Sequence, residues 1–341
     1  MNRKTVYFTA PRQVELREES LPALGAGDVL VETICSAISA GTEMLVYRGQ
    51  FPHLADSHDS FSSDLTYPLA YGYACVGRIT DIGEQVDKSL LDKLVFGFQP
   101  HTSAFICDPS TLIFTPDSFP AEACAFLPNM ETAVNLVQDA APILGERVLV
   151  LGQGVIGLLV ASLLNEFPLE ALVTSDCYEC RRKASHEIGV NDSFDPEFAY
   201  QSTNLNSMQY PLYAQSNKFD LTFELSGRPE TLNDALALTT FSGRIVIGSW
   251  YGEKKAPIDL GGTFHRSRIK LISSQVSSIA PELSGRWDKT RRFDVAWKAL
   301  ERIQPEKWIT HRFPIEEAAR AYELLDKNPQ ETIQVVFDYS K

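Results

Sequence analysis

The chain has 341 residues, more than one hydrophobic core usually serves, so two domains are expected. Hydrophobic residues make up 44% and charged residues 22%, the composition of a globular protein rather than of a disordered chain. The net charge of −13 argues against general binding to nucleic acid or to an anionic membrane, which requires a basic surface.

The N-terminus lacks the pattern of a secretory signal, because Arg3 and Lys4 lead directly into an alternating strand pattern. No stretch reaches the roughly 18 apolar residues that a membrane-spanning helix needs. The six cysteines are too scattered for a disulfide scaffold and suit a reducing compartment. We therefore expect a cytoplasmic protein with no membrane partner.

The first 120 residues predict a compact β-rich unit, because short apolar runs alternate with glycine and proline. The expected strands are Val29–Ile34, Ala74–Ile82, Leu94–Gly97 and Thr111–Phe114.

From Asn129 onward, strands alternate with helical patterns, which predicts βαβ units around a parallel sheet. The expected strands are Arg147–Gly152, Ala171–Asp176, Leu221–Gly227, Arg244–Trp250 and Ile269–Gln275. Helices are expected at Gly154–Phe167, Tyr178–Ile188 and Glu230–Thr240. The polar segment Ala199–Lys218 is interpreted as a loop or a poorly formed helix. In the C-terminal segment we expect a helix at Trp287–Ile303, a strand at Ile309–Phe313, a helix at Ile315–Leu325 and a last strand at Ile333–Tyr339.

The clearest motif is a GxGxxG turn that closes one predicted strand and opens a helix: Gly152, Gln153, Gly154, Val155, Ile156 and Gly157. Its first glycine permits a tight turn, its second lets the backbone approach a pyrophosphate, and its third allows close helix–strand packing. The helix N-terminus offers N–H groups to phosphates. The next strand ends at Asp176, near the spacing expected for the carboxylate that binds the adenosine ribose. These features predict a dinucleotide site, although the glycines alone could simply make a sharp turn.

Asp176 favours NAD over NADP, because a carboxylate accepts hydrogen bonds from ribose hydroxyls and repels a 2′-phosphate. NADP remains the alternative cofactor, because Arg181 or its neighbours Arg182 and Lys183 could bind a 2′-phosphate, although such a basic run also fits a solvated helix face. We expect Arg181, Ser226 and Gly248 to complete the cofactor contacts. The pair Cys177 and Cys180 is interpreted as two ordinary thiols, because it has no partner pair for a metal.

Several segments resemble the medium-chain dehydrogenase/reductase family of zinc-type alcohol dehydrogenase-like proteins, and together they cover essentially the whole chain. Ser39–Glu43 with Tyr47–Gly49 resembles the family's CGTD…YRG loop, and Tyr67–Gly77 resembles its P…GHE..G segment. Three further segments fit the family: Ser226-Gly227, Gly243–Val246 and Phe313–Ala319. Two others are most similar to a branch containing bacteriochlorophyllide hydroxyethyl dehydrogenases, whose substrate we do not carry over: Leu127–Ala133 and Ile272–Val276.

The resemblance implies an α/β protein with a GroES-like β-rich catalytic domain, residues 1–128 and 277–341. A Rossmann NAD(P)-binding domain with a doubly wound parallel sheet, residues 129–276, would be inserted in it. The implied activity is hydride transfer between nicotinamide and a small-molecule alcohol, carbonyl or activated alkene. The resemblance also implies a homodimer through Ile269–Gln275, although a buried internal strand would have the same composition.

The chain departs from the family's zinc pattern at the first two ligands. The ligand cysteine is replaced by Ala40, the ligand histidine by Tyr73, and the glutamate beside that histidine by Ala74. No cysteine or histidine lies between Leu127 and Ala140, and the four-cysteine lobe of structural zinc is absent. A catalytic zinc needs about three protein ligands. We therefore expect no zinc, with a zinc enzyme of shifted ligands as the alternative.

Without a Lewis acid, another group must stabilise the charge on the substrate oxygen. Tyr73 is the expected donor, because a phenol with a reference pKa of about 10 stays protonated at neutral pH; it could equally just fill the vacated metal space. Thr42 aligns with the family's hydroxyl residue that relays the substrate proton.

Other residues near these segments have weaker claims. Glu43 and Tyr47 could line the site or only pack in the interior. Three loop histidines could act as acids or bases: His53, His58 and His101. Three arginines could bind an anionic substrate or form a solvated helix face: Arg286, Arg291 and Arg292. A non-catalytic NAD(P)-binding sensor or scaffold is the alternative function.

Overall fold

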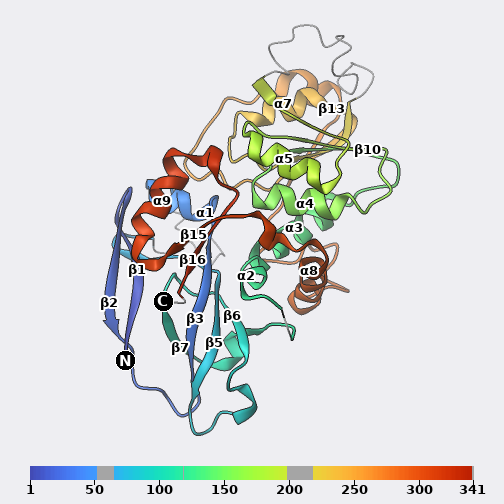
Figure 1. Cartoon of the computed structure of the whole chain (residues 1–341). Coiled ribbons are helices and arrows are strands. Elements are labelled where there is room, and N and C mark those ends of the chain that lie inside the picture. The colour runs from blue at the N-terminus through green and yellow to red at the C-terminus, as the bar shows by residue number, and fades with distance from the viewer. Residues whose placement is uncertain (52–64, 118, 198–217, 340–341) are drawn as a thin grey trace. The chain divides into compact units, whose positions relative to one another are not determined.

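The computed structural model describes residues 1–51, 65–117, 119–197 and 218–339. The chain forms two compact units, one of Met1–Pro128 with Leu300–Lys341 and the other of Asn129–Ala299 (Figure 1). None of the helices in the described ranges combines the length and the apolar character needed to cross a membrane.

The first unit is built on two sheets. The smaller has the order β2-β1-β4, from β1 (Asn2–Ala10), β2 (Gln13–Ser20) and β4 (Leu69–Ala70). The larger has the order β15-β16-β3-β5-β6-β8, with β7 paired to β3. Its strands are β3 (Val29–Ile38), β5 (Cys75–Ile82), β6 (Leu94–Gly97), β7 (Ala104–Cys107), β8 (Ile113–Phe114), β15 (Ile309–Pro314) and β16 (Gln334–Asp338). Since β16 pairs with β3, early and late parts of the chain share one sheet, as the blue and red strands of Figure 1 show.

Two helices cover a core between these sheets. In α9 (Ala318–Lys327) the buried positions recur with helical spacing, at Ala318, Ala321, Tyr322 and Leu325. In α1 (Thr42–Arg48) the five residues from Glu43 to Tyr47 are all buried. A glutamate inside such a run needs hydrogen-bond partners. The short helix α2 (Ala121–Cys124) completes the unit.

The second unit holds a six-stranded parallel sheet of order β11-β10-β9-β12-β13-β14. Its strands are β9 (Arg147–Leu151), β10 (Ala171–Ser175), β11 (Asp192–Phe194), β12 (Phe219–Glu224), β13 (Thr239–Ile247) and β14 (Lys270–Ser273). The first strand of this sheet along the chain, β9, lies inside the sheet, and the connections run outward from it in both directions. This doubly wound order places ligands at the carboxyl ends of the strands, where the direction changes between β9 and β12.

These strands are connected by the helices α4 (Val155–Leu164), α5 (Glu179–Ile188) and α7 (Thr231–Leu238), while α3 (Leu127–Ala140) precedes the sheet and α8 (Lys289–Ile303) follows it along the chain. The α/β fold predicted from the sequence is confirmed. The strand predicted at Val29–Ile34 runs on to Ile38, and the helix predicted from Ile315 starts as a 3₁₀ turn before α9. The prediction omitted β11 and α3. The predicted loop at 199–218 lies outside the described residues except for Lys218.

The chain leaves the second unit at Ala299, whereas the sequence-based boundary lies at residue 276. Arg292, on α8, explains the difference, because its side chain is fully buried within the second unit. Its guanidinium donates to Glu131 Oε1 over 2.7 Å and to Asn135 Oδ1 over 2.6 Å. This pairing also means that Arg292 is not available to an anionic substrate. Arg291 instead covers the ring of Trp287, 4.2 Å from its centroid.

Candidate functional site

The glycine turn after β9 is held by close packing at two of its three glycines. Gly152 has a φ of 94°, and a Cβ there would lie 2.5 Å from the carbonyl oxygen of Leu225. A Cβ on Gly157 would lie 1.9 Å from the oxygen of Gly152. The turns that follow β9 and β12 therefore approach each other too closely for any larger residue.

Gly154 differs from both, because the space beside it is open. Its φ is −66°, and the nearest atom to a Cβ there is Arg181 Nη1, at 4.0 Å. The first intrahelical bond of α4 runs from Leu158 N to Gly154 O, so the amides of Val155, Ile156 and Gly157 precede the helix's own ladder. Open space in front of such amides fits a phosphate group.

Gln153 carries an unusual buried acceptor at this turn. Its side chain is fully buried, and its Nε2 donates to Gly152 O over 3.0 Å. Within the described part of the chain, its Oε1 has no hydrogen-bond partner. An unpaired buried acceptor is costly, so a donor brought by a ligand would be favourable here.

Asp176 follows β10 directly and bends back to the glycine turn. Its Oδ2 accepts from Gln153 N over 2.7 Å and its Oδ1 accepts from Tyr178 N over 2.8 Å, with only 8% of the residue exposed. Arg181 Nη1 lies 3.8 Å from Asp176 Oδ2, while Arg182 Nη1 donates to the backbone carbonyl of Asp176 over 2.7 Å and pairs with Asp195 at 2.9 Å. The glycine turn, the acid and Arg181 thus form one cluster, as the sequence predicts.

Ser226 and Gly248 lie at the carboxyl ends of the neighbouring strands β12 and β13. Ser226 N donates to Glu224 Oε1 over 2.9 Å, and Tyr251 OH donates to Glu224 Oε2 over 2.5 Å. Gly227 N donates to Ser249 Oγ over 2.9 Å, which links the two turns. Sequence reasoning missed the buried carboxylate of Glu224, because an acid at a strand end carries no distinctive pattern.

Two neighbours of Asp176 also bear on the site. Burial raises the pKa of the thiols of Cys177 and Cys180, which is opposite to the change expected of a reactive pair. Arg228 donates to Glu230 Oε1 over 2.8 Å, and an interaction with Cys177, the residue after Asp176, adds to the rise in the pKa of Arg228. The sequence signal for Arg228 was its position directly after Ser226 and Gly227.

In the first unit, Tyr73 lies in the loop between β4 and β5. Burial raises the pKa of Tyr73 to about 12, and the nearby Glu43 carboxylate contributes to the rise. Tyr73 is therefore a proton donor across the physiological pH range.

Glu43 lies at the centre of a buried polar network in the first unit. Its Oε1 accepts from Ser39 N over 2.8 Å, and its Oε2 accepts from Tyr322 OH over 2.6 Å. His101 Nε2 lies 2.8 Å from Glu43 Oε2, and both residues are fully buried. On its other side, His101 Nδ1 lies 2.7 Å from Ser36 Oγ. Neither Glu43 nor His101 is a surface residue.

Tyr47, the third candidate of this region, packs in the core, where its ring stacks on Tyr322 with centroids 5.5 Å apart. His53 and His58 lie outside the described residues. Among the residues that are described, no group of three or more His, Cys, Asp and Glu side chains is arranged to hold a metal ion.

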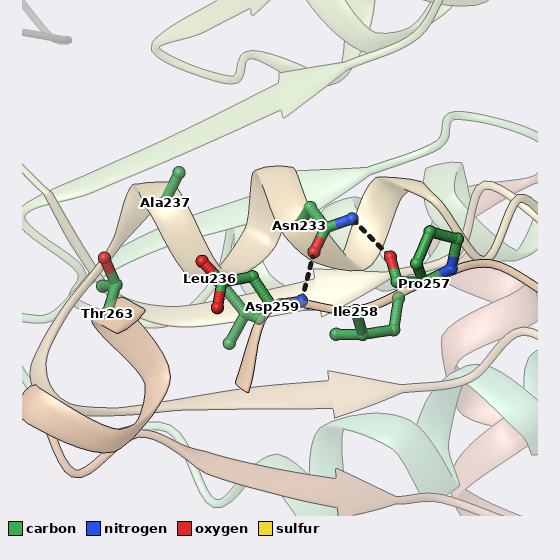
Figure 2. A pocket seen from close by; sticks show the side chains of 7 residues that line it. All are labelled: Asn233, Leu236, Ala237, Pro257, Ile258, Asp259 and Thr263. Carbon is green, nitrogen blue, oxygen red and sulfur yellow. Dashed lines mark hydrogen bonds between the residues drawn. The ribbon is translucent and has the colours of Figure 1, made fainter. Parts of the chain in front are cut away.

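A pocket of about 400 Å³ lies in the second unit, between α7 and the segment leading to β14 (Figure 2). Asn233 closes one side of it, because its Nδ2 donates to Pro257 O and its Oδ1 accepts from Asp259 N. The predicted cofactor residues do not line this pocket, whose lining consists of Asn233, Leu236, Ala237, Pro257, Ile258, Asp259 and Thr263.

Comparison with solved structures shows the class of fold. The chain matches a short chain alcohol dehydrogenase (RspB) of Escherichia coli CFT073 complexed with NADH, with a TM-score of 0.76, 19% identity and 99% of each chain covered. It matches galactitol-1-phosphate dehydrogenase of E. coli with a TM-score of 0.77, 17% identity and 98% and 99% coverage. The chain has the two-domain fold of the medium-chain alcohol dehydrogenases.

Relatives in sequence span the same length. The chain is 22% identical over 376 residues to the starvation-sensing protein RspB of E. coli K12, with 99% of this chain and all of the relative covered. It is 21% identical over 346 residues to L-threonine 3-dehydrogenase of Legionella pneumophila Corby, with 91% and 92% covered. No protein-family profile matches the chain. These relatives support the predicted similarity to NAD(P)-dependent medium-chain dehydrogenases.

Proposed function

We propose that the protein is a zinc-independent NAD(P)-dependent oxidoreductase that transfers hydride between nicotinamide and an alcohol or carbonyl substrate. The observation that carries this proposal is the cluster at the carboxyl ends of β9 and β10. There an open glycine position, the amides that start α4 and the anchored Asp176 carboxylate lie together. An activated alkene remains a further substrate class for the same chemistry.

The residues present fit a dinucleotide. The amides around Gly154 would hold the pyrophosphate, and Asp176 would accept the ribose hydroxyls. Arg181, Ser226 and Gly248 would border the rest of the cofactor. When bound, the nicotinamide supplies or accepts the hydride. NADH is the expected partner, because Asp176 opposes a 2′-phosphate; a relative in fold from Sinorhizobium meliloti 1021 is bound to NADP, so both cofactors belong in the test.

Tyr73 and Thr42 would act on the substrate oxygen. In the reductive direction the carbonyl carbon gains a hydride and its oxygen gains a proton, which the Tyr73 phenol can donate. Thr42 would supply a second hydrogen bond to the same oxygen. The zinc-independent part of the proposal rests on Ala40 and Tyr73, because neither an alanine methyl nor a neutral phenol replaces the thiolate and imidazole of a catalytic zinc site.

The first experiment is a parallel titration with NADH and NADPH that follows nicotinamide fluorescence. We expect saturable binding that favours NADH, then oxidation of NADH with members of a carbonyl panel, and loss of turnover in Tyr73→Phe. Turnover that Tyr73→Phe leaves unchanged would refute the role of Tyr73. Binding of neither cofactor would refute the proposal as a whole, and about one zinc per chain by metal analysis would refute its zinc-independent part.

A non-catalytic sensor is the second candidate, favoured by the name of one relative, the starvation-sensing protein RspB. Cofactor binding without turnover on any carbonyl or alcohol would support it. We also propose that the protein is a cytoplasmic homodimer joined through the edge strand β14. A further part of the proposal is that it belongs to the zinc-lacking branch, which the segments Leu127–Ala133 and Ile272–Val276 resemble. Sedimentation at several concentrations tests the dimer.

A further inference from the structure

We propose that Tyr251 and Glu224 brace the turn after β12, residues 225–228, and that Tyr251 is thereby a positioning residue for the nicotinamide half of the cofactor. The inference rests on the proposed function, because the ligand is taken to be a nicotinamide dinucleotide. Every contact that carries it lies within the second unit.

Glu224 is the last residue of β12, and its fully buried carboxylate joins two separate segments. Its Oε1 accepts from Ser226 N over 2.9 Å and also from the Ser226 hydroxyl. Its Oε2 accepts over 2.5 Å from the hydroxyl of Tyr251, four residues beyond the end of β13. Each oxygen thus serves one segment, so the carboxylate links the turn after β12 to the chain after β13.

Gly227, in the same turn, has both of its backbone polar groups tied to the chain after β13. Its N–H donates to Ser249 Oγ over 2.9 Å, and its carbonyl oxygen accepts from Lys254 Nζ over 2.9 Å. Its φ of 72° lies in the left-handed region, which glycine adopts without steric cost. Ser249, Tyr251 and Lys254 therefore hold one turn between them.

The glycine turn after β9 limits the turn after β12 from the other side. A Cβ on Gly152 would lie 2.5 Å from the carbonyl oxygen of Leu225. Beside Gly227, in contrast, a Cβ would meet no atom of the described residues within 4 Å, apart from its own chain neighbours. The turn is thus held by both neighbouring strand ends and still has open space for a ligand at Gly227.

The order of the strands assigns this turn to one half of a dinucleotide. In the sheet, β10 and β12 are the two neighbours of β9. With the pyrophosphate at the glycine turn after β9 and the adenosine ribose at Asp176 after β10, the rest of the cofactor extends the opposite way, over the carboxyl ends of β12 and β13. The turn after β12 therefore borders the nicotinamide half and lies away from the adenosine half.

The hydroxyl of Tyr251 is the part of the brace that can be removed with least other change, because the ring packs against the apolar core of the sheet. Without the hydroxyl, Glu224 Oε2 loses this hydrogen bond, and a buried acceptor left unpaired is costly. The carboxylate is then expected to turn towards another donor and to release Ser226 N. The turn becomes free to adopt other shapes, so it binds the nicotinamide half less well.

The test compares a ligand that spans both halves of the site with one that covers only the adenosine half. NADH binding is followed by nicotinamide fluorescence and ADP binding by calorimetry, for wild type and Tyr251→Phe. We expect the variant to bind NADH roughly five- to tenfold more weakly and to bind ADP as wild type does. A general structural defect would weaken both ligands, so equal weakening overturns the proposal, as does NADH binding at the wild-type affinity.

Tyr7→Phe is the matched control, because it also removes a bond from a tyrosine hydroxyl to a glutamate, that from Tyr7 OH to Glu19 Oε1 over 2.7 Å in the first unit. It should leave both affinities unchanged. Adding Glu224→Gln to Tyr251→Phe tests whether the two residues act as one brace. The double variant should then bind NADH no more weakly than the weaker of the two single variants, whereas additive losses would overturn the brace.

Should Tyr251→Phe fail to fold, Ser249→Ala tests the same brace, because it removes the side chain that accepts from Gly227 N. It should weaken NADH binding and leave ADP binding unchanged, and equal loss of both would overturn the proposal. If wild-type protein binds neither ligand, the proposed function fails and the inference fails with it. If wild type binds both ligands and the variants do not separate them, only the inference fails.

Discussion

Asp176→Asn is the substitution that tests the cofactor site most directly. The amide keeps the shape of the carboxylate, and its oxygen can still accept from one of the two backbone amides that now bind Asp176, those of Gln153 and Tyr178. What it loses is the charge. We expect weaker binding of NADH, and binding of NADPH that is unchanged or tighter.

The magnitude follows from the surroundings of Asp176. Because the residue is only 8% exposed, its hydrogen bonds to ribose hydroxyls would be charge-assisted and worth about 1.5–3 kcal/mol. Their loss corresponds to roughly 10- to 150-fold weaker NADH binding. Removing the negative charge also frees Arg181, now 3.8 Å from the carboxylate, to face a 2′-phosphate, which adds about 1 kcal/mol in favour of NADPH. The NADH/NADPH affinity ratio should fall by about two orders of magnitude.

Fluorescence titration of wild type and variant with both cofactors measures this ratio, and circular dichroism checks that each protein is folded. Asp195→Asn is the matched control, because Asp195 carries the same charge in the same region but pairs with Arg182 at 2.9 Å. It should change the ratio by less than about twofold. The assignment of Asp176 to the ribose is wrong if its variant keeps the wild-type ratio, or if the control shifts the ratio as much.

Three further predictions concern stability. Because the folded pKa of Tyr73 is raised to about 12 from an unfolded value of about 10, this group's contribution is present below pH 10 and is lost as the pH rises towards 12. At about pH 11 urea unfolding should therefore show wild type losing roughly 1 kcal/mol relative to Tyr73→Phe. Gly157→Ala should lower the free energy of unfolding by at least about 3 kcal/mol, because its Cβ would meet a backbone oxygen at 1.9 Å. Gly154→Ala, where the space is open, should leave the free energy of unfolding nearly unchanged and weaken cofactor binding at least about tenfold. Arg292→Met should cost about 3 kcal/mol, because the buried Glu131 would keep only the half-exposed ammonium of Lys289, at 3.5 Å, and adding Glu131→Gln should recover part of that loss.

The proximity of the glycine turn and Asp176 could be predicted from the sequence because its signals are local. The glycine turn occupies six consecutive residues, and Asp176 is placed by one helix and one strand that both have clear periodicity. Short-range spacing therefore fixes their geometry almost completely. Gln153 was predicted as part of the turn, but its buried side-chain oxygen, which no described residue pairs with, could not be, because the GxGxxG spacing does not determine the hydrogen bonds of that side chain.

The polar network of the first unit could not be predicted, because it is assembled from distant parts of the chain. Glu43 and His101 are 58 positions apart, and Glu43 and Tyr322 are 279 apart. Nothing in the residues around His101 distinguishes a buried histidine from one on a surface loop. The only sequence sign that Glu43 is buried was its position among apolar residues of α1, and that pattern also fits a short amphipathic helix with the glutamate exposed.

Under the proposed function, Tyr73 in place of a metal ligand would change how a substrate alkoxide is stabilised. A metal ion stabilises a substrate alkoxide by its charge in both directions of hydride transfer. A phenol stabilises it only by donating a hydrogen bond or a proton, which it can do while it is protonated. With a pKa of about 12, using Tyr73 as a base at neutral pH would first cost about 7 kcal/mol to ionise it. Reduction with Tyr73 as the proton donor would leave the same phenolate behind, and that phenolate must regain its proton from solvent, so the cost enters both directions and the pKa alone does not select one.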